Sequence, residues 1–228
     1  MPSYYGWEGD AVNERQLTLA LSHHVKSVYV LTLVGLKQFF ARGRSKLRGS
    51  ISENMRLLTL PCPYLPFPLD HLTIFFVSHI IALFAAVLKI LSIVDSIYVR
   101  NSLLAFGFMS MRNLARVTVV KFPAFVGDEF SPIVRNRLGK AVVKRLYATA
   151  DNLVVMKAGR VYVNSETFLE SIVRRGLSIR TPIFVISPGV DKKRIENIKT
   201  SFKTFGTSEM RIGFVGSLSW WQGADLLV

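Results

Sequence analysis

Three shortages narrow the classes of protein to which this 228-residue chain can belong. Its one cysteine, Cys62, excludes an internal disulfide framework and agrees with a reducing compartment. The chain has only 15 acidic residues against 29 Lys and Arg. The resulting net charge of +14 favours an anionic partner such as nucleic acid, anionic lipid or a phosphorylated substrate. The N-terminal stretch is polar, without the early apolar run of a secretory signal. We therefore expect a cytoplasmic protein, with a peripheral position on the inner face of the membrane as an alternative.

Several motifs that carry chemistry are also missing. The Gly-Lys-Ser/Thr ending of a Walker loop, the full G-x-G-x-x-G fingerprint and the G-x-S-x-G elbow of a hydrolase do not occur. The four histidines lack metal-ligand spacing with one another or with cysteine, so we expect no protein-bound metal and no cofactor. Nucleic acid is not an expected partner either, because the chain has no RNP motif and no basic face interleaved with exposed aromatics.

Half of the residues are apolar, which is enough for a sizeable core, and strand-like runs alternate with helical patterns. This alternation predicts an α/β fold with a Rossmann-like, doubly wound parallel sheet. The expected helices begin at Asp10, span 134–147 and follow a cap at Asn164 or Ser165, with Gly176 as the stop. The expected strands are 27–34, 56–60, 96–99, 115–122, 152–156, 160–163 and 183–186.

The order of these patterns predicts one domain, a connection and the start of a second domain. Residues 1–190 form the first domain, and the polar, weakly patterned segment 191–210 is the linker. Residues 211–228 then read as a strand, a glycine turn and the beginning of a helix. Because such a βα unit normally opens a domain, we expect the second domain to be incomplete in this chain.

The longest apolar stretch, Leu72 to Val94, is just long enough to cross a bilayer, which needs about 20 apolar residues. It contains Ser78, His79 and Lys89, and a lysine near one end of such a stretch can reach the interface. The stretch favours a core helix, since a strand follows at once. A surface contact with a membrane and a true transmembrane span stay open as alternatives.

Two glycine-containing loops are candidates for binding an anion or a sugar. Gly6 and Gly9 precede a helix for which Asp10 is the expected N-cap, and free backbone N–H groups there can meet an anion or a hydroxyl. A simple tight turn is the alternative. Gly216 and Gly223 bracket the second loop, after an apolar strand, where an ordinary βα loop is the alternative.

One acidic pair is expected near the carboxyl edge of the sheet. Asp128 and Glu129 follow the strand that ends at Lys121. Ligand sites of α/β proteins gather at this edge, although solvated loop charges would give the same pattern.

Five segments form a recognisable series along the chain. They are the Gly6/Gly9 loop before a helix, the strand pattern D-x-I-Y-x-R at 95–101, the helix start V-x-S-E at 162–166, a segment similar to V-I-P-N-G-V-D at 185–191, and a strand with a glycine loop at 212–227. In this order they resemble the N-terminal glycine loop, the N-domain strand and helix start, the interdomain segment and the donor-domain strand and loop of family-4 glycosyltransferases with the GT-B architecture.

The resemblance implies transfer of a sugar from a nucleotide-sugar donor to a glycan or lipid-linked acceptor, usually with retention. It implies an acceptor-side cleft in the first domain and a donor-diphosphate loop in the second, where developing charge would be stabilised electrostatically. The implied cleft residues are Arg100, Asn101, Lys121, Asp128, Glu129, Ser165 and Glu166, and the implied donor-loop residues are Gly216, Ser217, Gln222 and Gly223.

The chain departs from the family pattern at three places. Ser217 and Gln222 stand where the family commonly has Arg and Lys, so backbone N–H groups near Gly216 would contribute more. Lys121 lies roughly where the family often has a histidine, and the family's glutamate pair has no counterpart before the last residue. Specific catalytic residues are therefore not assigned by the resemblance.

A non-catalytic function competes with the transferase. The connector 37–48 and the helix 134–147 are rich in Lys and Arg, as in basic proteins that bind anionic membranes peripherally. Solvated surface charge explains the same pattern.

Overall fold

The computed structural model describes residues 9–35, 54–62, 70–130, 134 and 136–187. The chain divides into two compact units, Met1–Ile186 and Ser187–Val228. The expected linker 191–210 and the βα unit 211–228 lie outside the described residues. The described helices and strands all belong to the first unit.

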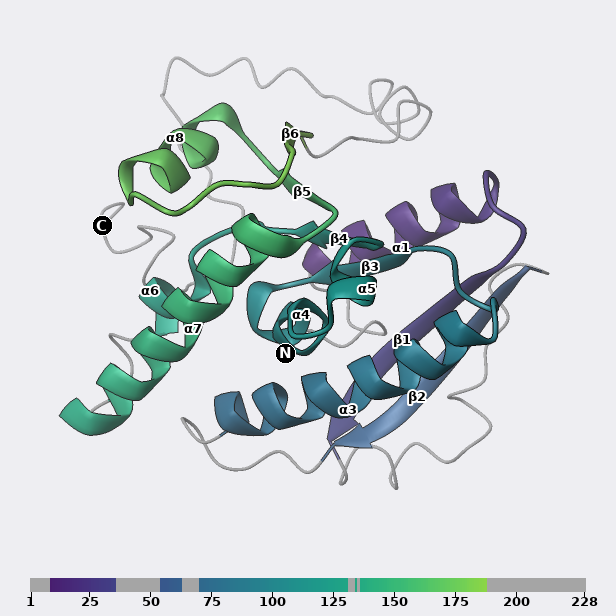
Figure 1. Ribbon diagram of the computed structural model, residues 1–228, viewed down its shortest axis with the longest axis horizontal. Coiled ribbons are helices and arrows are strands. Elements are labelled where there is room, and N and C mark those ends of the chain that lie inside the picture. The colour runs from purple at the N-terminus through teal and green to yellow at the C-terminus, as the bar shows by residue number, and fades with distance from the viewer. Residues whose placement is uncertain (1–8, 36–53, 63–69, 131–133, 135, 188–228) are drawn as a thin grey trace, which may run out of the picture. The chain divides into compact units, whose positions relative to one another are not determined.

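The described strands form two sheets, and every strand pairing is parallel (Figure 1). Strands β1 (Val28–Gly35) and β2 (Met55–Cys62) make the smaller sheet. The larger sheet has the order β3-β4-β5-β6. Its strands are β3 (Ile97–Arg100), β4 (Thr118–Lys121), β5 (Arg160–Val163) and β6 (Ile183–Val185). Parallel pairing with helical crossovers confirms the expected α/β class.

The helices after β3 cover one face of the larger sheet. They are α4 (Ser102–Met109), α5 (Arg112–Ala115), α6 (Val126–Phe130), α7 (Arg137–Lys157) and α8 (Glu166–Arg174). A single core cluster joins buried valines of β3, β4 and β5 to side chains of α4, α5, α7 and α8. On the opposite face Tyr98 and Tyr162 stack and their hydroxyls are 2.5 Å apart.

The parallel α/β arrangement is consistent with the Rossmann-like sheet that the sequence predicts, and the described helices of the larger sheet lie on one of its faces. Right-handed crossovers between strands that follow one another in a single direction place all their helices on the same face. Helices reach the other face only where the strand order reverses. The described strands of the larger sheet contain no reversal, and β1 and β2 pair separately. Leu31 and Leu33 of β1 nevertheless pack against the core cluster of the larger sheet.

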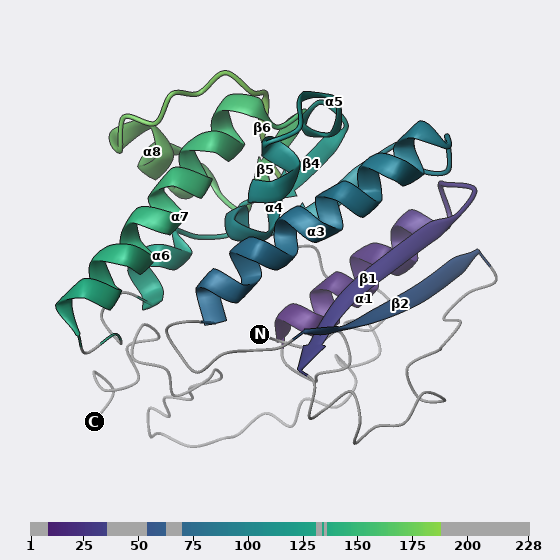
Figure 2. The same cartoon turned by 60° about the horizontal axis from the view of Figure 1, so that its bottom comes forward.

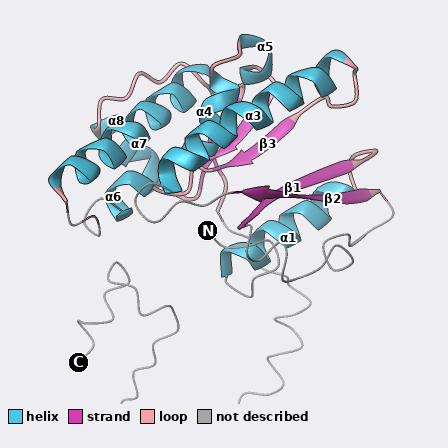
Figure 3. Cartoon of the chain, turned by 90° about the horizontal axis from the view of Figure 1, so that it is seen from below, coloured by secondary structure: helices cyan, strands magenta, loops and turns pink. Residues whose placement is uncertain are grey.

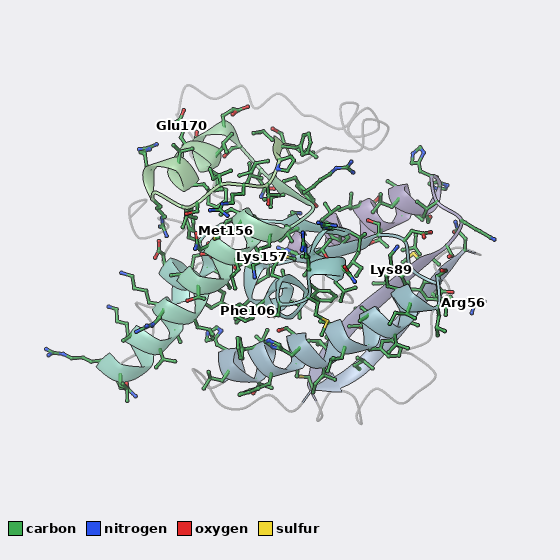
Figure 4. The ribbon with its side chains drawn as sticks, viewed as in Figure 1. Arg56, Lys89, Phe106, Met156, Lys157 and Glu170 are labelled. Atoms are coloured by element: carbon green, nitrogen blue, oxygen red, sulfur yellow. The ribbon has the colours of Figure 1, made fainter. Side chains whose placement is uncertain are left out.

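The long helix α3 (Asp70–Ile90) packs against α4, which in turn packs against α7 (Figure 2). The three helices lie side by side in Figure 3 as well. Gly107 lets α3 and α4 approach closely, because a Cβ there would collide with the backbone carbonyl of Ser78. The Gly107 N–H donates to Ser78 Oγ at 3.2 Å, and the centres of the Phe75 and Phe106 rings lie 4.8 Å apart. Phe106 is labelled in Figure 4.

One strand prediction is wrong, and another is longer than the strand it predicts. Residues 152–156 belong to α7, which runs ten residues beyond the expected end at Tyr147. Ala150, Val154 and Val155 continue the buried stripe that Val143 and Tyr147 begin, so helical packing overrides their strand preference. The expected strand 115–122 shortens to β4, because its first residue ends α5.

Two predictions about helix ends have opposite outcomes. Asp10 is not an N-cap, since α1 (Gly9–Ser22) already includes it. Ser165 caps α8 as expected, and Gly176 follows that helix with φ of +65°, a conformation that favours glycine.

The predicted apolar stretch 72–94 is helical only as far as Ile90, where α3 ends, and α3 differs from a fully buried core helix. Among the described residues, α3 is the one helix that is both long enough and apolar enough to cross a membrane. Its mean hydropathy over His71–Ile90 is 2.2. Only 28% of its most apolar window is buried, because one face packs on α4 and the other is exposed.

Candidate functional site

The carboxyl ends of β3 and β4 place two cations next to each other. Arg100 and Lys121 are the last residues of these strands and occupy paired positions in the parallel register. Both lie on the sheet face opposite the helices, because Val99 and Val120 point into the core. Two residues that the sequence assigns to one cleft therefore lie side by side.

Asn101 turns the chain from β3 into α4 at this edge. Its side chain caps the helix by accepting from the Leu103 N–H at 2.8 Å, and its own N–H donates to the Lys121 carbonyl at 3.2 Å. Its φ of +85° is unusual for a residue other than glycine. Such backbone strain persists where surrounding contacts fix it, and it is concentrated at ligand sites.

Ser165 and Glu166 follow β5 at the same edge. Ser165 Oγ accepts from the Phe168 N–H at 3.2 Å and so caps α8, while Glu166 lies in the first turn of that helix, where a negative charge meets the helix dipole favourably. Both are exposed. Their contacts are explained by helix capping alone.

Replacing Ser165 tests this capping role. We expect Ser165→Ala to lower the free energy of unfolding by about 1 kcal/mol, because the Phe168 N–H loses its partner. Urea denaturation measures this loss, and Ser165→Asp, which keeps a capping oxygen, is the matched control. A loss in both variants would contradict the capping role.

Asp128 and Glu129 lie in the short helix α6 beyond β4. Asp128 forms an ion pair with Arg175, which follows α8. The Arg175 guanidinium also lies 3.4 Å from the centre of the Phe125 ring, a cation–π contact. Asp128 is therefore part of a contact that joins α6 to the end of α8 rather than an isolated solvated charge.

A buried carboxyl lies close to this ion pair. Asp151 of α7 is 4% exposed and accepts a hydrogen bond from Ser102 Oγ at 2.5 Å. The pKa of Asp151 is raised to about 7, chiefly by burial and also by the nearby Asp128 charge, while the Ser102 hydroxyl and Arg175 oppose the shift. Asp151 can therefore gain or lose a proton near neutral pH.

Asp128, Asp151 and Arg175 line one cavity of about 410 Å³. Lys144, Phe125 and Leu177 complete much of its wall. Since Ser102 follows β3 and α6 follows β4, the cavity lies beyond the carboxyl ends of these two strands. Carboxylates that accept hydroxyl hydrogen bonds, cations and an aromatic ring suit a polar, hydroxyl-rich ligand.

Sequence reasoning assigned Asp128 but missed Asp151, Ser102, Lys144 and Arg175 as members of one site. The error over 152–156 hid Asp151, because the helix was expected to end before it. The sequence does contain one signal for Asp151. This acidic residue lies at helical spacing from Tyr147 and Val154, on the buried side of α7. No sequence pattern indicates that Arg175 reaches α6, since 47 residues separate it from Asp128.

The other assigned residues lie either in α1 or outside the described part of the chain. Gly9 and Asp10 lie within α1. Gly6, Gly216, Ser217, Gln222 and Gly223 lie outside the described residues. Among the residues that are described, no group of three or more His, Cys, Asp or Glu could hold a metal ion.

No protein-family model matches the chain, and no curated protein is significantly similar to it in sequence.

Proposed function

We propose that the chain is a glycosyltransferase whose first unit is the acceptor side of a GT-B fold. The observation that carries this proposal is the cavity with Asp151 beyond the carboxyl ends of β3 and β4. The resemblance of five segments to family-4 glycosyltransferases supports the same function. A nucleotide sugar is the donor, and a glycan or lipid-linked alcohol is the acceptor.

Asp151 is the proton acceptor of this proposal. In sugar transfer to an alcohol, the acceptor oxygen bonds to the anomeric carbon, the bond from that carbon to the phosphate oxygen of the donor breaks, and the nucleotide leaves. The attacking hydroxyl must lose its proton in this step. A carboxyl with a pKa of about 7 is poised for this role, because such a group is partly ionised at neutral pH and still basic enough to take a proton. Ser102 holds the carboxyl in place through its hydrogen bond.

The charged groups around Asp151 bind and orient the acceptor. Asp128 can accept hydrogen bonds from sugar hydroxyls, while Lys144 can donate to ring or hydroxyl oxygens. Arg100 and Lys121 lie at the strand ends on the other sheet face and are not among the residues that line this cavity.

Transfer from a panel of radiolabelled nucleotide sugars tests this function. We expect the full chain to move label from one donor into an organic-extractable lipid or a soluble glycan, with lipid extracts and oligosaccharides supplied as acceptors. Glu170→Gln, which changes an exposed carboxylate on α8, is the control and should transfer as the unaltered chain does. The proposal would be contradicted if no label were transferred and saturation-transfer NMR showed no binding of any nucleotide sugar.

A further inference from the structure

One face of α3 is apolar and exposed from Phe76 to Ile90. Its large side chains recur at intervals of three and four residues, which places them on one side of a helix. Each is between 51% and 81% exposed. These residues, here called the α3 stripe, are Phe76, Ile80, Leu83, Phe84, Val87 and Ile90.

The opposite face of α3 is fixed to the domain. Ile74, Ser78, Ile81 and Ala82 are buried there, and the backbone at Ser78 meets α4 at Gly107. A helix that crossed a bilayer from this position would have to separate from α4 and expose these residues, or take α4 and β3 with it. The packing therefore suits a helix that stays on the domain and offers only its outer side.

A groove adjoins the C-terminal end of the α3 stripe. It has a volume of about 310 Å³, and Ile90 belongs to both the stripe and the groove. Ala86, Met111 and Leu114 give it an apolar wall, while Lys89 and Arg112 add two cations. Lys89 is labelled in Figure 4. Acidic residues are not among those that line it. An apolar wall with paired cations matches the acyl chain and phosphate of an anionic lipid.

We propose that the α3 stripe lies in the interface of an anionic phospholipid bilayer, parallel to its surface, with a lipid phosphate at Lys89 and Arg112. Charge decides between this occupant and a second copy of the chain. A net charge of +14 makes two copies repel each other, whereas the same charge attracts the protein to anionic lipid. The inference does not rest on the transferase proposal, and it also fits a non-catalytic membrane protein.

Vesicle flotation with the full chain tests the surface contact. We expect binding to vesicles of phosphatidylcholine with phosphatidylglycerol, weaker binding to phosphatidylcholine alone, and release by salt. The double substitution Leu83→Glu with Val87→Glu should weaken binding at least tenfold, because it places two carboxylates on the α3 stripe. Val173→Glu is the matched control, since Val173 is an equally exposed apolar residue of α8 and lies outside the stripe.

A second double substitution tests whether the groove binds a lipid phosphate. Lys89→Gln with Arg112→Gln should reduce the preference for phosphatidylglycerol and leave the weaker binding to phosphatidylcholine unchanged. Alkaline carbonate should release the bound protein from the vesicles, as expected for a helix in the interface. Circular dichroism of each variant checks that the helical content is kept.

Three results would overturn the proposal. They are equal flotation of the stripe variant and the unaltered chain, resistance to carbonate, and a dimer in sedimentation that the stripe variant abolishes while flotation is absent. Flotation without sugar transfer would leave this inference standing and count against the transferase. Transfer to a soluble glycan without flotation would do the reverse.

Discussion

Replacing Gly107 with alanine is expected to lower the free energy of unfolding by about 3 kcal/mol, although alanine is the better helix former. The added Cβ would fall on the carbonyl of Ser78 and 2.7 Å from the His79 nitrogen. These are backbone atoms, so no change of rotamer relieves the collision and α3 and α4 must move apart. The hydrogen bond from the Gly107 N–H to Ser78 Oγ would lengthen at the same time.

Urea denaturation measures this effect, and Gly176→Ala separates it from a general cost of replacing glycine. Nothing lies within 4 Å of a Cβ at Gly176, where only the positive φ opposes a side chain. That control should lose about 1 kcal/mol. If Gly107→Ala is as stable as the unaltered chain, the close approach of α3 to α4 is wrong. The in-plane position proposed for the α3 stripe would then lose its main support.

The sequence predicts most of the parallel strands because their local signals agree with their tertiary setting. β1, β3 and β5 are short β-branched runs bounded by turns, and each appears within two residues of its expected start. The cap at Ser165 is equally local, since one hydroxyl and one N–H of the next turn decide it. Predictions of this kind need no knowledge of distant contacts.

The parts that could not be predicted depend on distant contacts. Val154 and Val155 have strand preference, yet they pack in the core as the last turns of α7. The exposure of the α3 stripe could not be read from composition either, because a helix apolar on all sides fits a core and a membrane equally well. The Asp151 site combines residues of α4, α6, α7 and the end of α8, which only the folded chain brings together.

Asp151→Asn is expected to raise the stability of the protein at pH 8 while abolishing most of its transfer activity. Asp151 has a folded pKa of about 7 and an ordinary value of 3.8, so the folded state holds the proton more tightly than the unfolded state. Stability is then greatest below about pH 4 and falls as pH rises, until the carboxyl is ionised above pH 7. The total loss is about 4 kcal/mol, since each pKa unit corresponds to about 1.4 kcal/mol.

Asparagine removes this loss because it has the shape of the protonated acid, cannot ionise and can still accept from Ser102 Oγ. Urea denaturation between pH 4 and pH 8 should therefore show a flatter stability profile for Asp151→Asn than for the unaltered chain. Glu170→Gln is the control, because this exposed carboxylate should change stability by less than about 0.5 kcal/mol at any pH. Parallel profiles for Asp151→Asn and the unaltered chain would show that Asp151 is not buried as described.

The same substitution separates a proton-transfer role from a structural one. A buried carboxyl that only joins α7 to α4 through Ser102 could be replaced by asparagine without loss of activity. A proton acceptor could not, and we expect transfer to fall by a factor of about 10² to 10⁴. In the unaltered chain, kcat/KM should rise with pH through about 7, as Asp151 loses its proton. A stable Asp151→Asn protein with full transfer and an unchanged pH profile would leave the sugar-transfer proposal without its proton acceptor.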